Sequence, residues 1–176
     1  MGRENMFVSM SRSAMEYGVY LGVFFIVRFV ITTLSVYVPM LSIISLIMTV
    51  AIPFLLYKFM MMYADRHYGA LSFIQYWMFG LLLFFFASLI SGVINYAYYE
   101  YINPDFLNSQ ISMLLGQLNS VESLKNSAMA RLFEEALENG TPTAIQMTVQ
   151  TIWSTVFWGS LLSAIIGAIV LWKNRY

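Results

Sequence analysis

Arg28 is the residue of this sequence whose type and position could do chemistry. It is the only charged side chain in the apolar stretch from Tyr17 to Tyr57. An unpaired arginine at such a position in a bilayer costs about 3 kcal/mol, so we expect Arg28 to face other helices and to find a polar partner. Two roles stay open for its guanidinium. It could be a structural clamp between helices, or it could contact an anion or a lipid headgroup.

Asn95 and Glu100 are the polar side chains that the sequence places within reach of Arg28. Residues 71–99 carry no formal charge, so Asn95 falls near the end of a long apolar helix and Glu100 at its boundary. The tyrosines around Glu100 are typical of the aromatic belt at a membrane interface, and a headgroup-binding pocket is the alternative. The sequence therefore predicts a candidate intramembrane polar site made of Arg28, Asn95 and Glu100.

No pattern typical of catalysis, of a metal site or of a cofactor site is present. The chain has no Cys and a single His, which excludes disulfides, thiolate metal sites and His-rich metal sites. We find no nucleophile motif, phosphate loop or dinucleotide fingerprint. A membrane enzyme acting on lipid-linked sugars would have only Glu100 and Asp105 as candidate acids at the interface. We expect a protein that is not an enzyme and that uses no cofactor.

The composition indicates that lipid surrounds most of this chain. Apolar residues make up 60% of the sequence and charged residues 10%, whereas roughly a quarter of the residues of a soluble domain are charged. So few charges cannot cover a water-exposed surface. Lys plus Arg and Asp plus Glu number 9 each, so there is no basic field to bind nucleic acid. The expected partner is the lipid bilayer.

Four apolar segments are long enough to cross a membrane, since about 20 residues suffice. Pro39 separates the first two, because it disfavours a helical conformation at Val38 and suits the first position of a helix. Pro53 falls inside the second, and we expect a kink there because the apolar run continues beyond it. The expected spans are about 14–37, 40–62, 71–101 and 142–172.

Residues 103–140 form the one extended polar segment. Apolar residues recur in it at steps of four and three, which indicates one face of an amphipathic helix. These residues are Leu107, Ile111, Leu114, Leu118 and Val121. The predicted fold class is therefore all-α: an integral membrane four-helix bundle in a single membrane domain, with an amphipathic helical insert between the third and fourth spans.

The basic residues predict the orientation of the chain, because Lys and Arg gather in cytoplasmic connections. They fall in the N-terminal tail, in the second connection and at the C-terminus, which share one side of a four-span protein. They are Arg3, Arg12, Lys58, Arg66, Lys173 and Arg175. We expect a multi-pass protein of the inner (plasma) membrane with both termini cytoplasmic and the insert outside.

Small residues at four-residue spacing mark candidate helix-packing faces. Lipid tails are as apolar as leucine, so helices in a membrane associate where small residues allow close approach. The faces comprise Gly18 and Gly22 in the first span, Ser88 and Gly92 in the third, and Gly159, Ser163 and Gly167 in the fourth. They could serve packing within the chain, or they could receive a partner helix or a second copy of the protein.

The region from Tyr57 to Leu107 carries a family resemblance. It contains Tyr63-Ala64-Asp65-Arg66-His67-Tyr68-Gly69, then Ser72-Phe73 and Gly80, then Tyr96-x-x-Tyr99-x-x-Ile102-x-Pro104-Asp105-Phe106-Leu107. This pattern resembles a family of small Bacteroidota membrane proteins, domain of unknown function 4199. The resemblance implies a four-helix inner-membrane protein. It brings neither an activity nor catalytic residues.

Two functions fit these observations. The first is a non-enzymatic scaffold or partner subunit of a membrane assembly, which would pack against a second copy or against another membrane protein. The alternative is a small transporter or lipid-handling protein that uses a polar pocket around Arg28. A guanidinium sealed by a polar partner favours the scaffold, and one that a lipid can reach favours the alternative.

Overall fold

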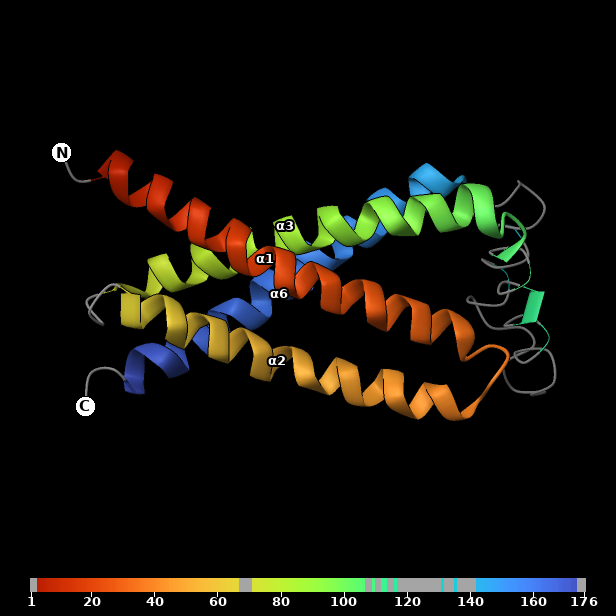
Figure 1. Ribbon diagram of the computed structural model, residues 1–176, viewed down its shortest axis with the longest axis horizontal. Coiled ribbons are helices and arrows are strands. Elements are labelled where there is room, and N and C mark those ends of the chain that lie inside the picture. The colour runs from red at the N-terminus through yellow and green to blue at the C-terminus, as the bar shows by residue number, and fades with distance from the viewer. Residues whose placement is uncertain are drawn as a thin grey trace. The chain divides into compact units, whose positions relative to one another are not determined.

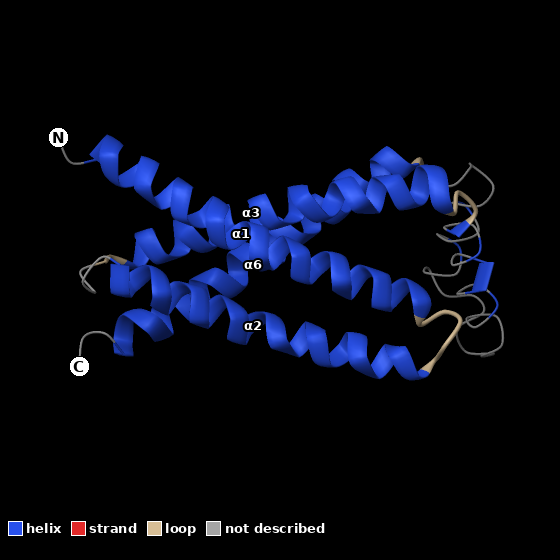
Figure 2. Ribbon diagram, in the orientation of Figure 1, coloured by secondary structure: helices blue, strands red, loops and turns tan. Residues whose placement is uncertain are grey.

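The computed structural model describes residues 3–66, 71–106, 109, 112, 113, 116, 131, 135 and 142–173. Over these residues the chain is helical and contains no strand (Figures 1 and 2). The elements are α1 (Arg3–Leu34), α2 (Met40–Arg66), α3 (Phe73–Ala97), the π-helical turn η1 (Tyr98–Ile102) and α6 (Ala144–Lys173). The four α-helices are each long and apolar enough to cross a membrane. The predicted all-α, four-helix membrane architecture is thus confirmed.

Two of the helices extend beyond their expected spans. Helix α1 begins at Arg3 rather than near residue 14, because neither proline nor glycine interrupts the chain between Arg3 and Tyr17. Helix α2 continues through Pro53 to Arg66 rather than ending near residue 62. Most of the predicted amphipathic insert, residues 103–140, lies outside the described residues, so its helical character stays a prediction.

Side-chain caps fix where two of the helices begin. At the start of α3, Gln75 Oε1 accepts hydrogen bonds from the backbone N–H and the hydroxyl of Ser72, at 2.6 and 3.1 Å. At the start of α6, Gln146 Oε1 accepts from the backbone N–H of Thr143 at 3.0 Å, and the Thr143 hydroxyl accepts from the N–H of Gln146. The pair Thr143–Gln146 is a capping box, with both reciprocal bonds. At Ser72–Gln75 only the bond from the Gln side chain back to the backbone N–H is of this kind, and it likewise satisfies a backbone group near the helix end.

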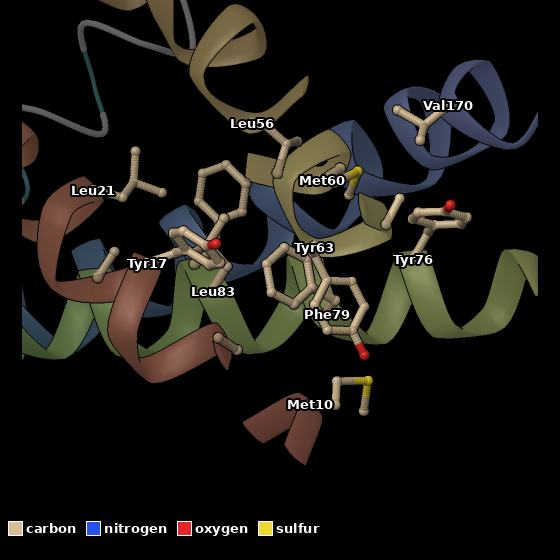
Figure 3. Close-up of a cluster of buried hydrophobic side chains, with 14 of the residues drawn as sticks. Met10, Tyr17, Leu21, Leu56, Met60, Tyr63, Tyr76, Phe79, Leu83 and Val170 are labelled. Carbon is tan, nitrogen blue, oxygen red and sulfur yellow. The ribbon is translucent and has the colours of Figure 1, made fainter. Parts of the chain in front are cut away.

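The chain forms two compact units, one of Met1–Val93 with Thr151–Tyr176 and one of Ile94–Gln150. The core of the first unit is rich in aromatic rings (Figure 3). The rings of Tyr63 and Phe79 stack with centroids 4.2 Å apart. Tyr17 stacks on Phe59 at 5.4 Å. These contacts join α1, α2 and α3. They lie in the halves of α1 and α2 that are away from the turn between Leu34 and Met40.

Helix α3 is the most buried of the four helices and α2 the least. In the most apolar eighteen-residue window of each helix, 44% of residues are buried in α3 but 6% in α2. Helix α1 runs antiparallel to α2 and beside it (Figure 1). The first half of α2 therefore offers most of its apolar surface to whatever surrounds this unit.

In the unit Ile94–Gln150, α3 ends in a widened turn. The backbone N–H of Asn103 donates to the carbonyl of Tyr98 at 2.9 Å, five residues earlier, which is the hydrogen bond of a π-helix. Phe106 then packs against two of the preceding tyrosines, with ring centroids 5.5 Å from Tyr98 and 6.1 Å from Tyr99. The ring of Phe106 thereby fills the space beside these tyrosines.

Candidate polar site and helix-packing faces

Arg28 is joined to α2 through Thr49. The Nε–H of Arg28 donates a hydrogen bond of 3.0 Å to Thr49 Oγ1. The hydroxyl of Thr49 donates in turn to the carbonyl of Ser45, one turn earlier in α2, at 2.8 Å. The Thr49 hydroxyl therefore accepts a hydrogen bond from the guanidinium and at the same time donates its proton to a carbonyl of its own helix.

Thr32 and Ser45 close this chain of bonds into a ring. The hydroxyl of Thr32 donates to the carbonyl of Arg28 at 2.8 Å, and its oxygen lies 2.6 Å from Ser45 Oγ. Because the Thr32 proton is directed to the Arg28 carbonyl, Ser45 is the donor between the two hydroxyls. Arg28, Thr32, Ser45 and Thr49 thus form a closed hydrogen-bonded ring in which each residue donates once and accepts once.

The spacing of these residues explains why the ring can form. Arg28 and Thr32 are four residues apart on α1, and Ser45 and Thr49 are four residues apart on α2. Residues four apart share one face of a helix. Where the two antiparallel helices lie side by side, Arg28 therefore faces Thr49, and one turn further along Thr32 faces Ser45. The sequence reasoning missed Thr32, Ser45 and Thr49. Their common spacing on either side of the Pro39 turn is the signal that could have revealed them.

The guanidinium of Arg28 has only part of its bonding capacity satisfied. Arginine carries five N–H donors, and the ring uses the one on Nε. Among the described residues of the unit Met1–Val93 with Thr151–Tyr176, no carboxylate pairs with Arg28. The side chain is half-buried. The positive charge and the N–H groups on both terminal nitrogens thus lack a counterpart within the described part of that unit.

The predicted partners Asn95 and Glu100 belong to the other unit, so their approach to Arg28 stays a prediction. The side chain of Asn95 is only 5% exposed, and its Oδ1 accepts no hydrogen bond among the described residues. Glu100 lies in η1 and is exposed. Asn95 thus has the burial expected of a residue that bonds another helix, and Glu100 has the exposure expected at an interface.

The small residues of α1 lie directly against α3. A Cβ atom added to Gly18 would lie 2.8 Å from the Cβ of Phe86, and one added to Gly22 would lie 3.1 Å from the Cβ of Ile90 and 3.3 Å from the carbonyl of Ala87. Carbon atoms pack at about 3.5–4.0 Å, so neither position has room for a larger side chain. The two glycines let the backbones of α1 and α3 approach.

The small residues of α6 also lie directly against α3. A Cβ on Gly159 would overlap the ring of Phe84, and one on Gly80 of α3 would overlap Ser163. Beyond these contacts, a Cβ on Gly167 would lie 3.1 Å from the Cβ of Tyr76. Helix α6 therefore packs on α3 along the whole predicted series Gly159, Ser163 and Gly167.

The third predicted face, on α3, is also buried. Ser88 and Gly92 are both inaccessible, and the Ser88 hydroxyl donates to the carbonyl of Phe85 in its own helix at 2.9 Å. Packing within the chain therefore occupies or buries every predicted small-residue face. A partner helix would have to bind elsewhere.

Two other basic side chains, Arg66 and Lys173, also have partners, and that of Arg66 is a carboxylate. Arg66 forms an ion pair of 3.0 Å with Glu16 and lies 5.1 Å from the ring centre of Tyr17. Lys173 donates to the hydroxyl of Tyr57 at 2.9 Å. These cations are exposed, and water and lipid headgroups are at hand there. Arg28 differs in that it lies within the apolar stretch of its helix and is half-buried.

Comparison with known proteins gives one match. The profile of a family described as a protein of unknown function, DUF4199, matches residues 16–171. This range includes the hydrogen-bonded ring and all the small-residue faces described above. No curated protein and no solved structure matches the chain.

Proposed function

The chain belongs to the DUF4199 family, a family of unknown function, and we propose that it acts as a non-enzymatic scaffold or partner subunit of a membrane assembly. Its four apolar helices indicate a membrane protein. The observation that carries the proposal is the low burial of α2: only 6% of the residues in its most apolar eighteen-residue stretch are buried. A helix that its own chain leaves so exposed can offer a long surface to another protein.

Five of the exposed apolar side chains of α2 lie along one face. They follow one another at steps of three and four residues, the spacing at which side chains share a helix face. Each is between 57% and 78% exposed. The face, which we call the α2 stripe, consists of Met40, Ile43, Ile47, Val50 and Phe54. We propose that a helix of a second copy or of another membrane protein packs against the α2 stripe.

We further propose that the protein lies in the inner membrane with both termini cytoplasmic. Arg12, Lys58, Arg66 and Lys173 support this orientation, because they fall toward the N-terminal end of α1 and the C-terminal ends of α2 and α6, which share one side in a four-span protein. Basic residues near span ends favour the cytoplasmic side. The segment between η1 and α6 would then be outside.

Cysteine cross-linking in native membranes tests the proposed partner surface. The chain has no cysteine, so Ile47→Cys introduces a single thiol on the α2 stripe. Ile165→Cys is the matched control, because Ile165 has a similar exposure on α6, 60% against 62%. We expect a cross-linked product from Ile47→Cys and little from Ile165→Cys. Equal yields, or purification of the protein as a lone monomer after mild solubilisation, would contradict the proposal.

A further inference from the structure

We propose that Arg28, held by the hydrogen-bonded ring, binds the phosphate group of a membrane lipid. This inference goes beyond the proposed partner surface, because it involves the interface between α1 and α2 and not the α2 stripe. It takes up the lipid contact that the sequence left open for Arg28, and a lipid held there can coexist with a partner on the α2 stripe. It rests on the fixed orientation of the guanidinium and on the lack of a carboxylate partner within the described part of its unit. The position of Arg28 along its apolar span supports it.

The ring orients the guanidinium without consuming its binding edge. The bond from Nε to Thr49 fixes one edge of the planar group. The two terminal nitrogens remain, and their parallel N–H groups match the spacing of two oxygens on one phosphate or carboxylate. Held in this way, Arg28 loses less side-chain freedom when it binds an anion than a mobile arginine would.

The chemistry of the ring favours an anion over a neutral ligand. The hydroxyl protons of Thr32, Ser45 and Thr49 are all donated inside the ring. A sugar or another neutral polar group would therefore find no free hydroxyl donor on these residues. The remaining attraction comes from the guanidinium and its charge, which a phosphate satisfies with charge-assisted hydrogen bonds.

The depth of Arg28 favours a lipid as the source of the phosphate. Arg28 follows Leu21, the middle residue of the span Val8–Leu34, by seven residues, or about 10 Å of helix. The hydrocarbon core extends about 15 Å from its midplane. With the middle of this span at the midplane, the Cα of Arg28 would lie about 5 Å inside the boundary, within reach of headgroups for a long side chain. Val27 and Val30, each 46% exposed, offer apolar surface beside it for acyl chains.

Lipid binding by the full-length protein in detergent tests this assignment. Native mass spectrometry would compare dioleoylphosphatidylglycerol with dioleoylglycerol, which has the same chains but no phosphate, and a third sample would contain inorganic phosphate. We expect wild-type protein to bind the phospholipid roughly tenfold more tightly than the glycerolipid, and Arg28→Gln to lose this preference. The matched control Arg12→Gln removes an exposed arginine outside the ring and should keep it.

Several outcomes would overturn the proposal. Equal affinity for the two lipids would show that the phosphate is not recognised. Binding of inorganic phosphate as tight as that of the phospholipid would refute a lipid source. If Glu100 is the counter-ion, the wild type shows no preference and Glu100→Gln gains one. Should Arg28→Gln fail to fold, Arg28→Lys keeps the charge without the paired donors, and its preference should fall several-fold. An unchanged preference in Arg28→Lys would exclude recognition by the guanidinium.

Discussion

Replacing Thr49 with valine should destabilise the protein by leaving a charge without its partner. Valine has nearly the shape of threonine but its side chain neither accepts nor donates a hydrogen bond. Thr49→Val therefore removes the 3.0 Å bond from Arg28 Nε and the 2.8 Å bond to the Ser45 carbonyl. The guanidinium then remains between α1 and α2 without the hydrogen bond that joins it to α2.

The size of this effect follows from the kind of bond that is lost. Hydrogen bonds to charged groups contribute about 1.5–3 kcal/mol in proteins, whereas bonds between helices in membranes average about 0.6 kcal/mol and reach about 1.7. For a half-buried arginine we expect the free energy of unfolding to fall by about 1–2 kcal/mol. In the Arg28→Met background the same Thr49→Val change should cost about 0.5 kcal/mol or less, because no charge is left unpaired.

A double-mutant cycle measures this difference. Wild type, Thr49→Val, Arg28→Met and the double variant would be unfolded reversibly by SDS in mixed micelles and followed by circular dichroism. We expect a coupling energy of about 1 kcal/mol. Thr148→Val is the matched control, because the buried hydroxyl of Thr148 donates to the carbonyl of Ala144 in its own helix. An equal cost of Thr49→Val in both backgrounds would refute the reasoning.

Three further predictions concern other parts of the chain. Gly159→Leu should cost about 1–3 kcal/mol in the same SDS titration, because its side chain has no room beside α3; Gly116→Leu, at a position with open space, should cost little. Ser112→Cys should react with a membrane-impermeant maleimide added outside intact cells, and reaction only after the cytoplasm is opened would reverse the proposed orientation. Glu16→Gln should leave the unfolding midpoint nearly unchanged, because its pair with Arg66 is exposed, and a clear drop would contradict this.

The helices can be predicted from the sequence because their length and apolar composition require them. Four uncharged or nearly uncharged runs and a turn at Pro39 leave few alternatives for a chain in lipid. The start of α1 is harder to predict for a related reason. Arg3 and Glu4 are polar, which argues against burial in lipid, but polarity does not stop a helix from continuing into water.

The hydrogen-bonded ring lies beyond sequence reasoning because it depends on the register of two helices. The type of Arg28 and its position in the apolar stretch show that it needs a partner. They do not decide whether that partner lies at the far end of α3 or on the neighbouring face of α2. Thr49 is easily overlooked, since a hydroxyl in an apolar helix usually bonds its own backbone. It does so here as well, and the same oxygen also accepts from Arg28. Only the alignment of α1 with α2 shows both bonds.

The ring also bears on how the chain enters the membrane during synthesis. When α1 leaves the ribosome, Thr49 is still inside the exit tunnel, so Arg28 must enter lipid alone or wait at the translocation channel. An arginine costs about 2.5–3.5 kcal/mol at the centre of an inserting helix and less toward its ends, and α2 reduces the cost for Arg28 once it arrives. We therefore expect α1 and α2 to insert as a pair. Nascent chains cut after residue 34 should integrate less completely than chains cut after residue 66, and Arg28→Leu should abolish the difference.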